Sequence, residues 1–418
     1  MRNDLGMQAR PEATPHAHIP SPPQSREHGT QVAIVGAGPA GLILAQLLAC
    51  QGVHSIVVER RDRAYVEHRL RAGVLEQTTV DLLHAAGVGD RMDREGLVHE
   101  GLYLQFDGVR HRIALRELTG GRAITVYGQH EVVKDLIAAR LAAGGEIVFE
   151  AEDVRVLEID GDRPAVRFRV GGEERTVRCD FVAGCDGFHG ICRPAIPAGA
   201  LTTFERTYPF AWLGILAETP PSLDELVYAH HERGFALHSM RSPELTRLYV
   251  QCEPDDTLDT WPDERVWEEL HRRLATRDGW VLHEGRVVEK SITAMRSFVV
   301  EPMQYGRLFL AGDAAHVVPP TGAKGLNLAA ADVRVLAEGL IDWYRSGRRA
   351  LLDAYSATCL RRVWRVEHFS WWMTTMLHRA PGDDPFDQRL QLAQLRYVCG
   401  SRAAATSLAE NYVGLEHV

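Results

Sequence analysis

The 418-residue chain has no run of eighteen or more apolar residues, so no membrane-spanning helix is expected. It also has no C-x-x-C pair, and its seven cysteines are widely spaced and odd in number. A disulfide framework, a zinc site and a dithiol redox centre are therefore poorly supported, and scattered thiols in a reducing cytoplasm are expected. The net charge of −9 comes without a basic excess, which argues against nucleic acid as the main partner.

The first 29 residues are rich in proline, histidine, glutamine and arginine and lack the apolar stretch of a secretory signal. We expect them to form a disordered tail. The whole chain is 45% hydrophobic and 25% charged, and it is long enough for two or three domains. A soluble, cytoplasmic protein is therefore expected.

A β-α-β unit is predicted directly after this tail. A β-type run over 31–35 leads into a G-x-G-x-x-G motif, an apolar helical pattern to about Gln51 and a second strand over 55–58. The glycines are Gly36, Gly38 and Gly41, and Glu59 closes the second strand. Glycines at this spacing also occur in ordinary loops. With a strand, a helix and an acid in the required places, however, the unit is typical of a dinucleotide site that binds a pyrophosphate and a ribose.

The remaining pattern mixes strands and helices. Short alternating runs fill 101–126, a helix is predicted from Gln129 to about Ala143, and residues 146–183 resemble a β-meander. Four alternating runs within 207–252 are expected to form one sheet with a face toward a ligand. A helix is predicted near 262–275, and helical periodicity runs from Gly325 to about Tyr344 and on to about residue 377.

Two later motifs select the nucleotide. Gly184-Cys-Asp-Gly187 follows an apolar strand, and Gly312-Asp-Ala-Ala-His316 follows the strand predicted over 307–311. Each would be an ordinary turn if it stood alone. In this order after the first motif, they resemble the class A FAD-dependent aromatic hydroxylase family. That resemblance implies that Asp313 binds the ribityl chain of FAD and that Asp186 serves both FAD and NAD(P)H.

Longer strings resemble the 4-hydroxybenzoate-hydroxylating members of this family from residue 31 to 415. They are RAGVLEQ at 71–77, GCDGFHG at 184–190, RSFVVEP at 296–302, the stretch 312–329, FSWWM at 369–373 and AENYVG at 409–414. The implied fold is of the α/β class, with a Rossmann-like FAD-binding domain, a mostly antiparallel substrate sheet and C-terminal helices. The implied divisions are a tail (1–29), the FAD-binding domain (30–98, 126–206 and 298–325), the substrate domain (99–125 and 207–297) and a helical interface region (326–418).

The resemblance also implies an activity. A monooxygenase of this kind uses FAD, NADPH and O2 to convert 4-hydroxybenzoate into 3,4-dihydroxybenzoate, and it acts as a homodimer that meets through the C-terminal helices. A hydroxylase of a sister acid, such as 3-hydroxybenzoate or 4-aminobenzoate, is an alternative. A flavin reductase or oxidase and a non-enzymatic FAD-binding regulator are weaker ones.

Candidate substrate residues follow from the same resemblance. Without it, Arg241 would be interpreted as a solvated arginine at a strand edge; with it, Arg241 is expected to bind the substrate carboxylate through a bidentate guanidinium. Tyr228, Tyr412 and His99 are expected to carry the phenolic proton outward. The other implied contacts are Ser239 and Tyr249 as hydrogen-bonding helpers, the Pro320 carbonyl opposite the substrate hydroxyl, and Thr321 beside it.

Cofactor residues are assigned in the same way. The implied FAD contacts, beyond those already named, are Arg69, Arg71, Gln129, Lys324, Gly325, Leu326 and Asn327, with Arg247 influencing the flavin position. The amides that begin the helix near Gly325 would stabilise negative charge on a reduced flavin. The implied NADPH contacts are Arg60, Arg61, Tyr65, Arg71, His189 and Arg193, since guanidinium groups suit a 2′-phosphate. Arg61 and His68 depart from the family pattern, so the choice between NADPH and NADH stays open. His238, beside Ser239, also departs from it, at the edge of the expected substrate pocket.

Overall fold

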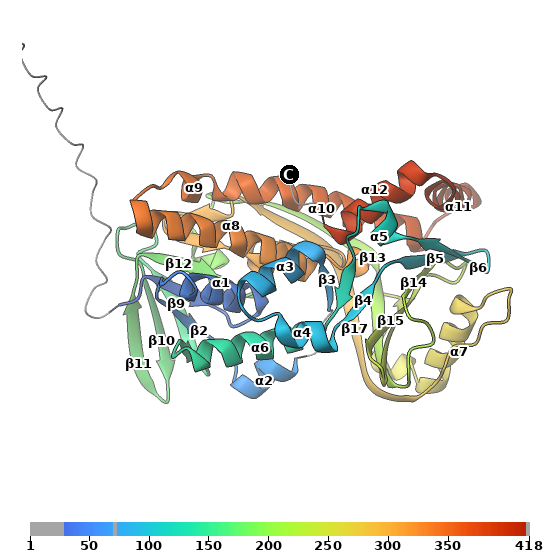
Figure 1. Cartoon of the computed structure of the whole chain (residues 1–418), viewed down its shortest axis with the longest axis horizontal. Coiled ribbons are helices and arrows are strands. Elements are labelled where there is room, and N and C mark those ends of the chain that lie inside the picture. The colour runs from blue at the N-terminus through green and yellow to red at the C-terminus, as the bar shows by residue number, and fades with distance from the viewer. Residues whose placement is uncertain (1–28, 70–72, 415–418) are drawn as a thin grey trace, which may run out of the picture.

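The computed structural model describes residues 29–69 and 73–414. They form an elongated molecule in which two large sheets lie side by side, with helices running across both (Figure 1). Arg71 and residues 1–28 of the predicted tail lie outside the described residues.

The first large sheet is parallel except for its edge strand β18. Its order is β18-β19-β12-β1-β2-β8, so β1 lies between β12 and β2. All residues of β1 and β12 are buried, as expected for strands covered on both faces. Helix α1 packs against α6 and α8. The bounds are β1 Val32–Val35, β2 Ser55–Val58, β8 Glu146–Val148, β12 Phe181–Gly184, β18 Gln304–Tyr305, β19 Leu308–Leu310, α1 Pro39–Ala49, α6 Gln129–Ala142 and α8 Gly325–Ser346.

The single β-meander predicted over 146–183 is wrong at both ends. Only β9 (Glu152–Leu157), β10 (Ala165–Val170) and β11 (Glu173–Arg178) form a three-stranded antiparallel sheet. Strand β8 pairs in parallel with β2, and β12 pairs in parallel with β1. These short strands are drawn into the parallel sheet by partners far away in the sequence, which local alternation does not reveal.

The second large sheet has the order β20-β17-β13-β16-β15-β14-β5-β6. The four runs predicted within 207–252 do form one sheet, as β13 to β16. The long strand β17 was not predicted, since its buried, half-buried and exposed residues follow one another without a clean alternation. The bounds are β5 Leu102–Phe106, β6 Val109–Ile113, β13 Thr202–Glu218, β14 Leu226–Ala229, β15 Ala236–Ser242, β16 Leu245–Cys252, β17 Arg286–Glu301 and β20 His316–Val317.

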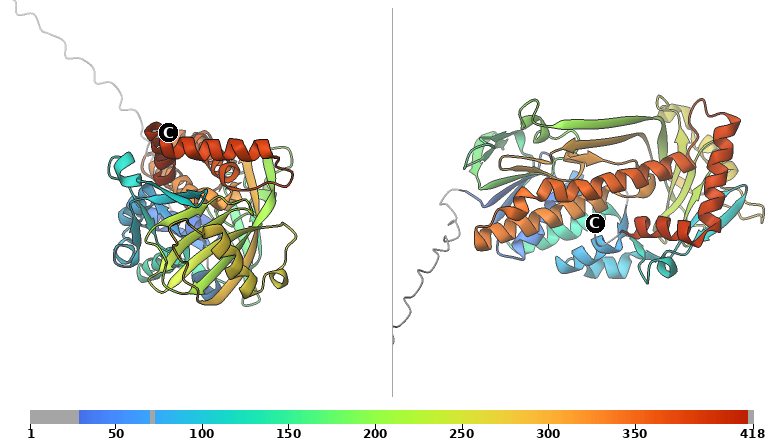
Figure 2. Two further views of the ribbon diagram at one scale, coloured as in Figure 1. Left: turned by 90° about the vertical axis from the view of Figure 1, so that its right-hand side faces the viewer. Right: turned by 90° about the horizontal axis from the view of Figure 1, so that it is seen from above.

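Helices cover both faces of this second sheet. On one face, α7 packs on β15 and β16 through Trp267, Leu270 and other apolar residues. The other face meets α10, α11 and α12 in a core that contains Tyr228 and Tyr412. The bounds are α7 Asp263–Leu274, α10 Tyr355–Leu377, α11 Pro385–Gly400 and α12 Arg402–Val413. Helix α10 also packs against α8, so it runs along both halves of the molecule (Figures 1 and 2).

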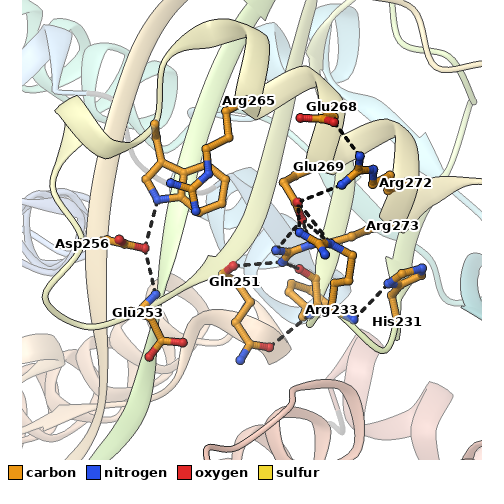
Figure 3. A network of polar contacts seen from close by, with 12 residues as sticks. His231, Arg233, Gln251, Glu253, Asp256, Arg265, Glu268, Glu269, Arg272 and Arg273 are labelled. Carbon is orange, nitrogen blue, oxygen red and sulfur yellow. Dashed lines mark hydrogen bonds and ion pairs between the residues drawn. The ribbon is translucent and has the colours of Figure 1, made fainter.

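A buried ion network attaches α7 to the sheet (Figure 3). Glu269 receives Arg273 at 2.9 Å and also binds Arg233. The Arg273 guanidinium further donates to the carbonyl oxygens of Phe235 at 3.1 Å and Gln251 at 2.9 Å. Arg273 therefore fixes the ends of β15 and β16, the two strands that carry Ser239, Arg241 and Tyr249.

Smaller elements connect the two large sheets. The sheet β3-β7-β4 lies between them (Figure 1). No helix in the described part of the chain is long and apolar enough to cross a membrane. The bounds are β3 Val74–Glu76, β4 Leu97–His99, β7 Ile124–Val126, α2 Arg63–His68, α3 Gln77–Ala85, α4 Asp90–Glu95, α5 Leu115–Leu118, α9 Ala350–Asp353, η1 Arg193–Ala195, η2 Leu258–Thr260, η3 Gly312–Ala314 and η4 Pro320–Gly322.

Candidate active site

The glycine motif forms the turn between β1 and α1. Gly36 has φ +105°, and an added Cβ would collide with the Cys185 carbonyl. A Cβ on Gly41 would collide with the Gly36 carbonyl, so both positions require glycine. At Gly38, by contrast, a Cβ would meet nothing within 4 Å. The backbone there faces open space at the start of α1, where a helix N-terminus attracts a phosphate.

Glu59 stands beside this turn, directly after β2. Its carboxylate accepts hydrogen bonds from the amides of Ala37 and Arg61, each at 2.8 Å. The turn and Glu59 line a single pocket whose other predicted members are Arg60, Arg61, Tyr65, Arg69 and Gln129. The guanidinium groups of Arg61 and Arg69 lie 4.8 and 5.7 Å from the centre of the Tyr65 ring. The structure thus brings three residues expected for NADPH into the same pocket as the residues expected for FAD.

The pocket also contains Asp186 and Gly187, from the loop after β12. One carboxylate oxygen of Asp186 accepts the Cys192 amide at 2.8 Å, and the other is buried with no partner among the described residues. Burial raises the pKa of Asp186, and its backbone hydrogen bonds oppose that rise. An unsatisfied acceptor beside a glycine turn is what a hydroxyl-rich ligand would complete.

The loop of the late motif, Gly312 to His316, is fixed by a buried hydrogen-bonded pair of Asp332 and His316 that the sequence did not predict. The amide of Gly312, which has φ +63°, donates to Asp332 Oδ2 at 2.9 Å, and His316 Nε2 lies 2.6 Å from the same oxygen. Burial opposes a charged imidazolium, but Asp332 outweighs it and raises the pKa of His316. Asp313 is exposed on this loop. An aspartate within an apolar helical stretch was the signal that could have revealed Asp332.

These features fit FAD. The open backbone at Gly38, the helix N-terminus of α1, the carboxylate of Glu59 and the orphaned oxygen of Asp186 match the pyrophosphate and the hydroxyls of a dinucleotide. At the other end, Gly325 begins α8, and a Cβ there would meet nothing within 4 Å. The residues present therefore suit the pyrophosphate and ribose of the cofactor, and they leave room beside the start of α8.

The candidate substrate residues lie on three adjacent strands. Tyr228 is on β14, Ser239 and Arg241 are on β15, and Tyr249 is on β16. Tyr412 reaches this sheet from α12, and its hydroxyl oxygen lies 2.5 Å from that of Tyr228. Both side chains are fully buried, and burial raises the pKa of both phenols well above the usual value.

Arg241 lies where the two halves of the molecule meet. A Cβ added to Gly73 would come within 2.8 Å of its Nη1, and the carbonyl of Tyr127 is close by. Burial lowers the pKa of Arg241, Tyr249 and Glu289 raise it, and Arg247 lowers it further. An arginine stays protonated in proteins. Its surroundings therefore disfavour the positive charge of the guanidinium, and a bound carboxylate would stabilise that charge.

The turn η4 and the start of α8 are attached to the same region. Thr321 Oγ1 lies 2.8 Å from Thr374 Oγ1 on α10, and Pro320 is half-buried. Lys324 is 1% exposed, so it is a buried lysine and not a surface one. Its amine donates to Glu76 at 2.5 Å and to the Tyr412 carbonyl at 3.0 Å. Lys324 thus connects the proposed flavin side to the backbone that carries Tyr412.

Two further candidates have their polar groups occupied by the protein. Asn327 accepts from the Glu76 amide at 2.9 Å and the Thr79 hydroxyl at 2.8 Å, and it donates to the carbonyls of Val74 and Ala323. Arg193 donates to the carbonyls of Ala314 and Phe188. Leu326 is half-buried and His189 is exposed. His189 and Arg193 do not line the pocket of Arg60, Arg61 and Tyr65, so the predicted NADPH residues fall into two groups.

His99 ends β4 and is 1% exposed. Neither ring nitrogen has a hydrogen-bond partner among the described residues. Burial lowers the pKa of His99 to about 4, against the opposing effect of Glu225 and Asp224. Its imidazole is therefore neutral at neutral pH, and no hydrogen bond among the described residues joins it to the Tyr228–Tyr412 pair.

Comparison with known proteins agrees with this site. A family model described as an FAD binding domain matches residues 29–370. The p-hydroxybenzoate hydroxylase of Acinetobacter baylyi is 50% identical over 388 residues, covering 93% of this chain and 96% of that protein. The aklavinone 12-hydroxylase of Streptomyces purpurascens is 27% identical, covering 80% and 68% respectively. The fold matches p-nitrophenol 4-monooxygenase of Pseudomonas putida with a TM-score of 0.82 at 21% identity, over 94% of this chain and 100% of that one.

The family model covers most of the chain, and the Acinetobacter relative aligns along nearly its full length. The expected α/β fold, the FAD cofactor and the resemblance based on motifs are thereby confirmed. The chain belongs to the FAD-dependent aromatic hydroxylase family and is a flavoprotein monooxygenase.

Proposed function

We propose that this protein hydroxylates 4-hydroxybenzoate beside its phenol group and releases 3,4-dihydroxybenzoate, with NADPH and O2 as co-substrates. One observation carries the proposal: the buried Tyr228–Tyr412 hydrogen bond lies on the same sheet as the half-buried, positively charged Arg241. A phenol at one end and a carboxylate at the other are the two polar groups of this acid. The 50% identity with the p-hydroxybenzoate hydroxylase of Acinetobacter baylyi supports the same substrate.

In this proposal, Arg241 binds the carboxylate and fixes the orientation of the ring. A guanidinium forms two parallel hydrogen bonds with a carboxylate, and both gain strength in a site shielded from water. Ser239 and Tyr249 supply neutral donors on the neighbouring positions of β15 and β16. Arg247, whose guanidinium lies 5.2 Å from the Tyr249 ring centre and 3.7 Å from Glu289, sets the position of that tyrosine.

Tyr228 and Tyr412 remove the phenolic proton of the substrate. A phenolate ring is richer in electrons than a phenol, so its carbon beside the hydroxyl attacks an electrophilic oxygen more readily. Since burial raises the pKa of both tyrosines, neither stands ionised at neutral pH. Each therefore accepts one proton as it gives up another. The buried imidazole of His99, which is neutral at rest, accepts the proton at the outer end as it releases another, and the Pro320 carbonyl faces the substrate hydroxyl.

FAD, when bound, supplies the electron transfer and the activation of oxygen. Gly36, Gly38 and Gly41 cradle its pyrophosphate, Glu59 its ribose and Asp313 its ribityl chain, while Gln129, Arg69 and Arg71 add polar contacts. Gly325 and Leu326 present the first amides of α8 to the flavin. Lys324 and Asn327 act less directly, because their polar groups hold β3, α12 and the turn before α8 in place.

NADPH is the proposed reductant. Arg60, Arg61 and Tyr65 offer a basic surface for a 2′-phosphate, with His189 and Arg193 closer to the loop after β12. We also propose a homodimer that meets through the C-terminal helices. Helix α11 leaves Phe386, Leu390 and Tyr397 largely exposed, and a partner subunit would cover such an apolar face.

The test is to measure NADPH oxidation by the FAD-loaded protein with and without 4-hydroxybenzoate, and to identify the products. Strong stimulation with one 3,4-dihydroxybenzoate per NADPH supports the proposal. Stimulation that yields only hydrogen peroxide means that the acid triggers reduction without being the substrate, and 3-hydroxybenzoate and 4-aminobenzoate are then tested. Parallel assays with NADH decide the nicotinamide, and sedimentation decides the dimer.

A further inference from the structure

A chain of three hydrogen bonds links the substrate sheet to the turn η4. Trp212 Nε1 donates to His378 Nε2 at 2.6 Å, and His378 Nδ1 lies 2.9 Å from the Thr374 carbonyl. The Thr374 hydroxyl lies 2.8 Å from that of Thr321. All four residues are at most 3% exposed.

Every donor in this chain has a defined direction. The indole can only donate, so His378 Nε2 is unprotonated and its Nδ1–H donates to the Thr374 carbonyl. The Thr374 hydroxyl donates to the Ser370 carbonyl at 2.7 Å, so it accepts from Thr321. Burial lowers the pKa of His378 to about 3, which keeps the imidazole neutral. The connection is therefore a single, fully satisfied arrangement with no alternative proton positions.

The same imidazole stacks among the aromatic rings behind the substrate residues. Its ring centre lies 4.4 Å from that of Phe235 and 4.7 Å from that of Phe210. Phe235 contacts Tyr228 at 6.2 Å, and Trp212 contacts Tyr249 at 4.9 Å, between ring centres. His378 thus supports both tyrosines that face the proposed substrate, while α10 attaches it to the turn expected beside the flavin.

We propose that His378 and Thr374 are positioning residues that hold the substrate-binding sheet at a fixed distance from the Pro320–Gly322 turn. This inference rests on the proposed function, because it assigns the two ends of the chain to substrate and flavin. Oxygen transfer needs the acceptor ring and the flavin edge aligned within a fraction of an ångström. Without the alignment, NADPH and O2 are still consumed, but two electrons and two protons convert O2 to hydrogen peroxide in place of product.

The test replaces the Thr374 hydroxyl alone. Thr374→Val removes the acceptor of Thr321, Thr374→Ser keeps it, and Thr375→Val changes the adjacent exposed threonine as a matched control. We expect Thr374→Val to lower the fraction of NADPH that yields 3,4-dihydroxybenzoate by about twofold or more, with the dissociation constant of 4-hydroxybenzoate within about twofold of wild type. The serine variant should restore the fraction, and the control should match wild type.

Hydrogen–deuterium exchange of the FAD-loaded proteins gives a second readout that needs no turnover. Peptides covering residues 319–327 should exchange faster in Thr374→Val than in wild type, Thr374→Ser or Thr375→Val. The inference would be overturned if Thr374→Val changed neither the fraction of NADPH that yields product nor the exchange rate. It would also be overturned if Thr374→Val lowered that fraction and Thr374→Ser did not restore it. If the wild-type protein forms no product from this acid, the proposed function fails, and the exchange data alone decide whether Thr374 holds the turn.

Discussion

The hydroxyl oxygens of Tyr228 and Tyr412 lie 2.5 Å apart, although the residues are 184 positions apart in the sequence. One is on β14 and the other on α12, and both rings belong to the core between the sheet and the C-terminal helices. Two neutral phenols share one hydrogen bond, so one of the two hydroxyl protons is left for a third partner. In the proposed reaction, that third partner is the substrate phenolate when Tyr228 donates to it. It is a group on the outward side of the relay when Tyr412 donates instead.

Removing this pair should slow proton transfer selectively. Tyr228→Phe deletes the hydroxyl next to the substrate, and we expect the hydroxylation rate to fall by about 100-fold while FAD remains bound. Stopped-flow absorbance and the flavin content after gel filtration measure the two quantities. Tyr208→Phe is the matched control, because Tyr208 is also buried and its hydroxyl lies 3.2 Å from Ser297. A Tyr228→Phe protein with unchanged turnover would remove Tyr228 from the relay.

The carboxylate site should depend on guanidinium geometry and not on charge alone. Arg241→Lys keeps the charge but replaces a two-pronged donor with a point charge. We expect the dissociation constant of 4-hydroxybenzoate to rise about 100-fold, which corresponds to roughly 3 kcal/mol. Titration of the flavin absorbance measures it. Arg286→Lys, at an exposed arginine on β17 of the same sheet, should bind like wild type. Equal affinity in the Arg241→Lys protein would place the carboxylate elsewhere.

Sequence patterns with a local cause were predicted well. The β-α-β unit, the helix that begins at Gln129 and the helix that begins at Gly325 were all found, because turn glycines and helical periodicity are written in adjacent residues. The grouping of the G-x-G-x-x-G turn with Glu59 was predicted for the same reason, and the structure brings them within hydrogen-bonding distance. Strand β17 and the placement of β8 and β12 were missed, since their partners are remote in the sequence.

Buried polar partners were the harder part of the site. Lys324 was expected near the flavin, but nothing local indicates that Glu76, 248 positions away, would receive its amine. The hydrogen bond between Trp212 and His378 spans 166 positions, and a single histidine after an apolar helix does not predict an indole partner. Such pairs are set by tertiary packing, which period and propensity do not encode.

In the α7 network, Arg273 should contribute more to the stability of the protein than the adjacent Arg272 does. Arg273→Met leaves Glu269 in a buried site without its 2.9 Å partner and frees the carbonyls of Phe235 and Gln251. We expect a loss of roughly 3 kcal/mol. Arg272→Met removes a half-exposed pair with Glu268 and a longer contact of 3.9 Å with Glu269, and it should cost less than about 1 kcal/mol. Thermal unfolding of the FAD-loaded proteins compares them. Equal losses would show that burial of the pair (Figure 3) does not matter.

Glu367 should make the stability of the protein depend on pH near neutrality. Its side chain is buried on α10, one carboxylate oxygen has no partner among the described residues, and burial raises its pKa from 4.5 to about 7. Below about pH 4.5 the carboxyl is protonated in both states. Between about pH 4.5 and pH 7 this carboxyl ionises only in the unfolded chain, so the folded state loses stability as pH rises, by up to roughly 3 kcal/mol.

The test is Glu367→Gln, whose side chain stays neutral at every pH. The variant should therefore match wild type near pH 4 and exceed it increasingly up to about pH 7, as measured by thermal unfolding at each pH. Exposed Glu338→Gln on α8 is the control, and its difference from wild type should not vary with pH in this way. A constant difference for Glu367→Gln would mean that this carboxyl ionises at its ordinary pKa, despite its burial.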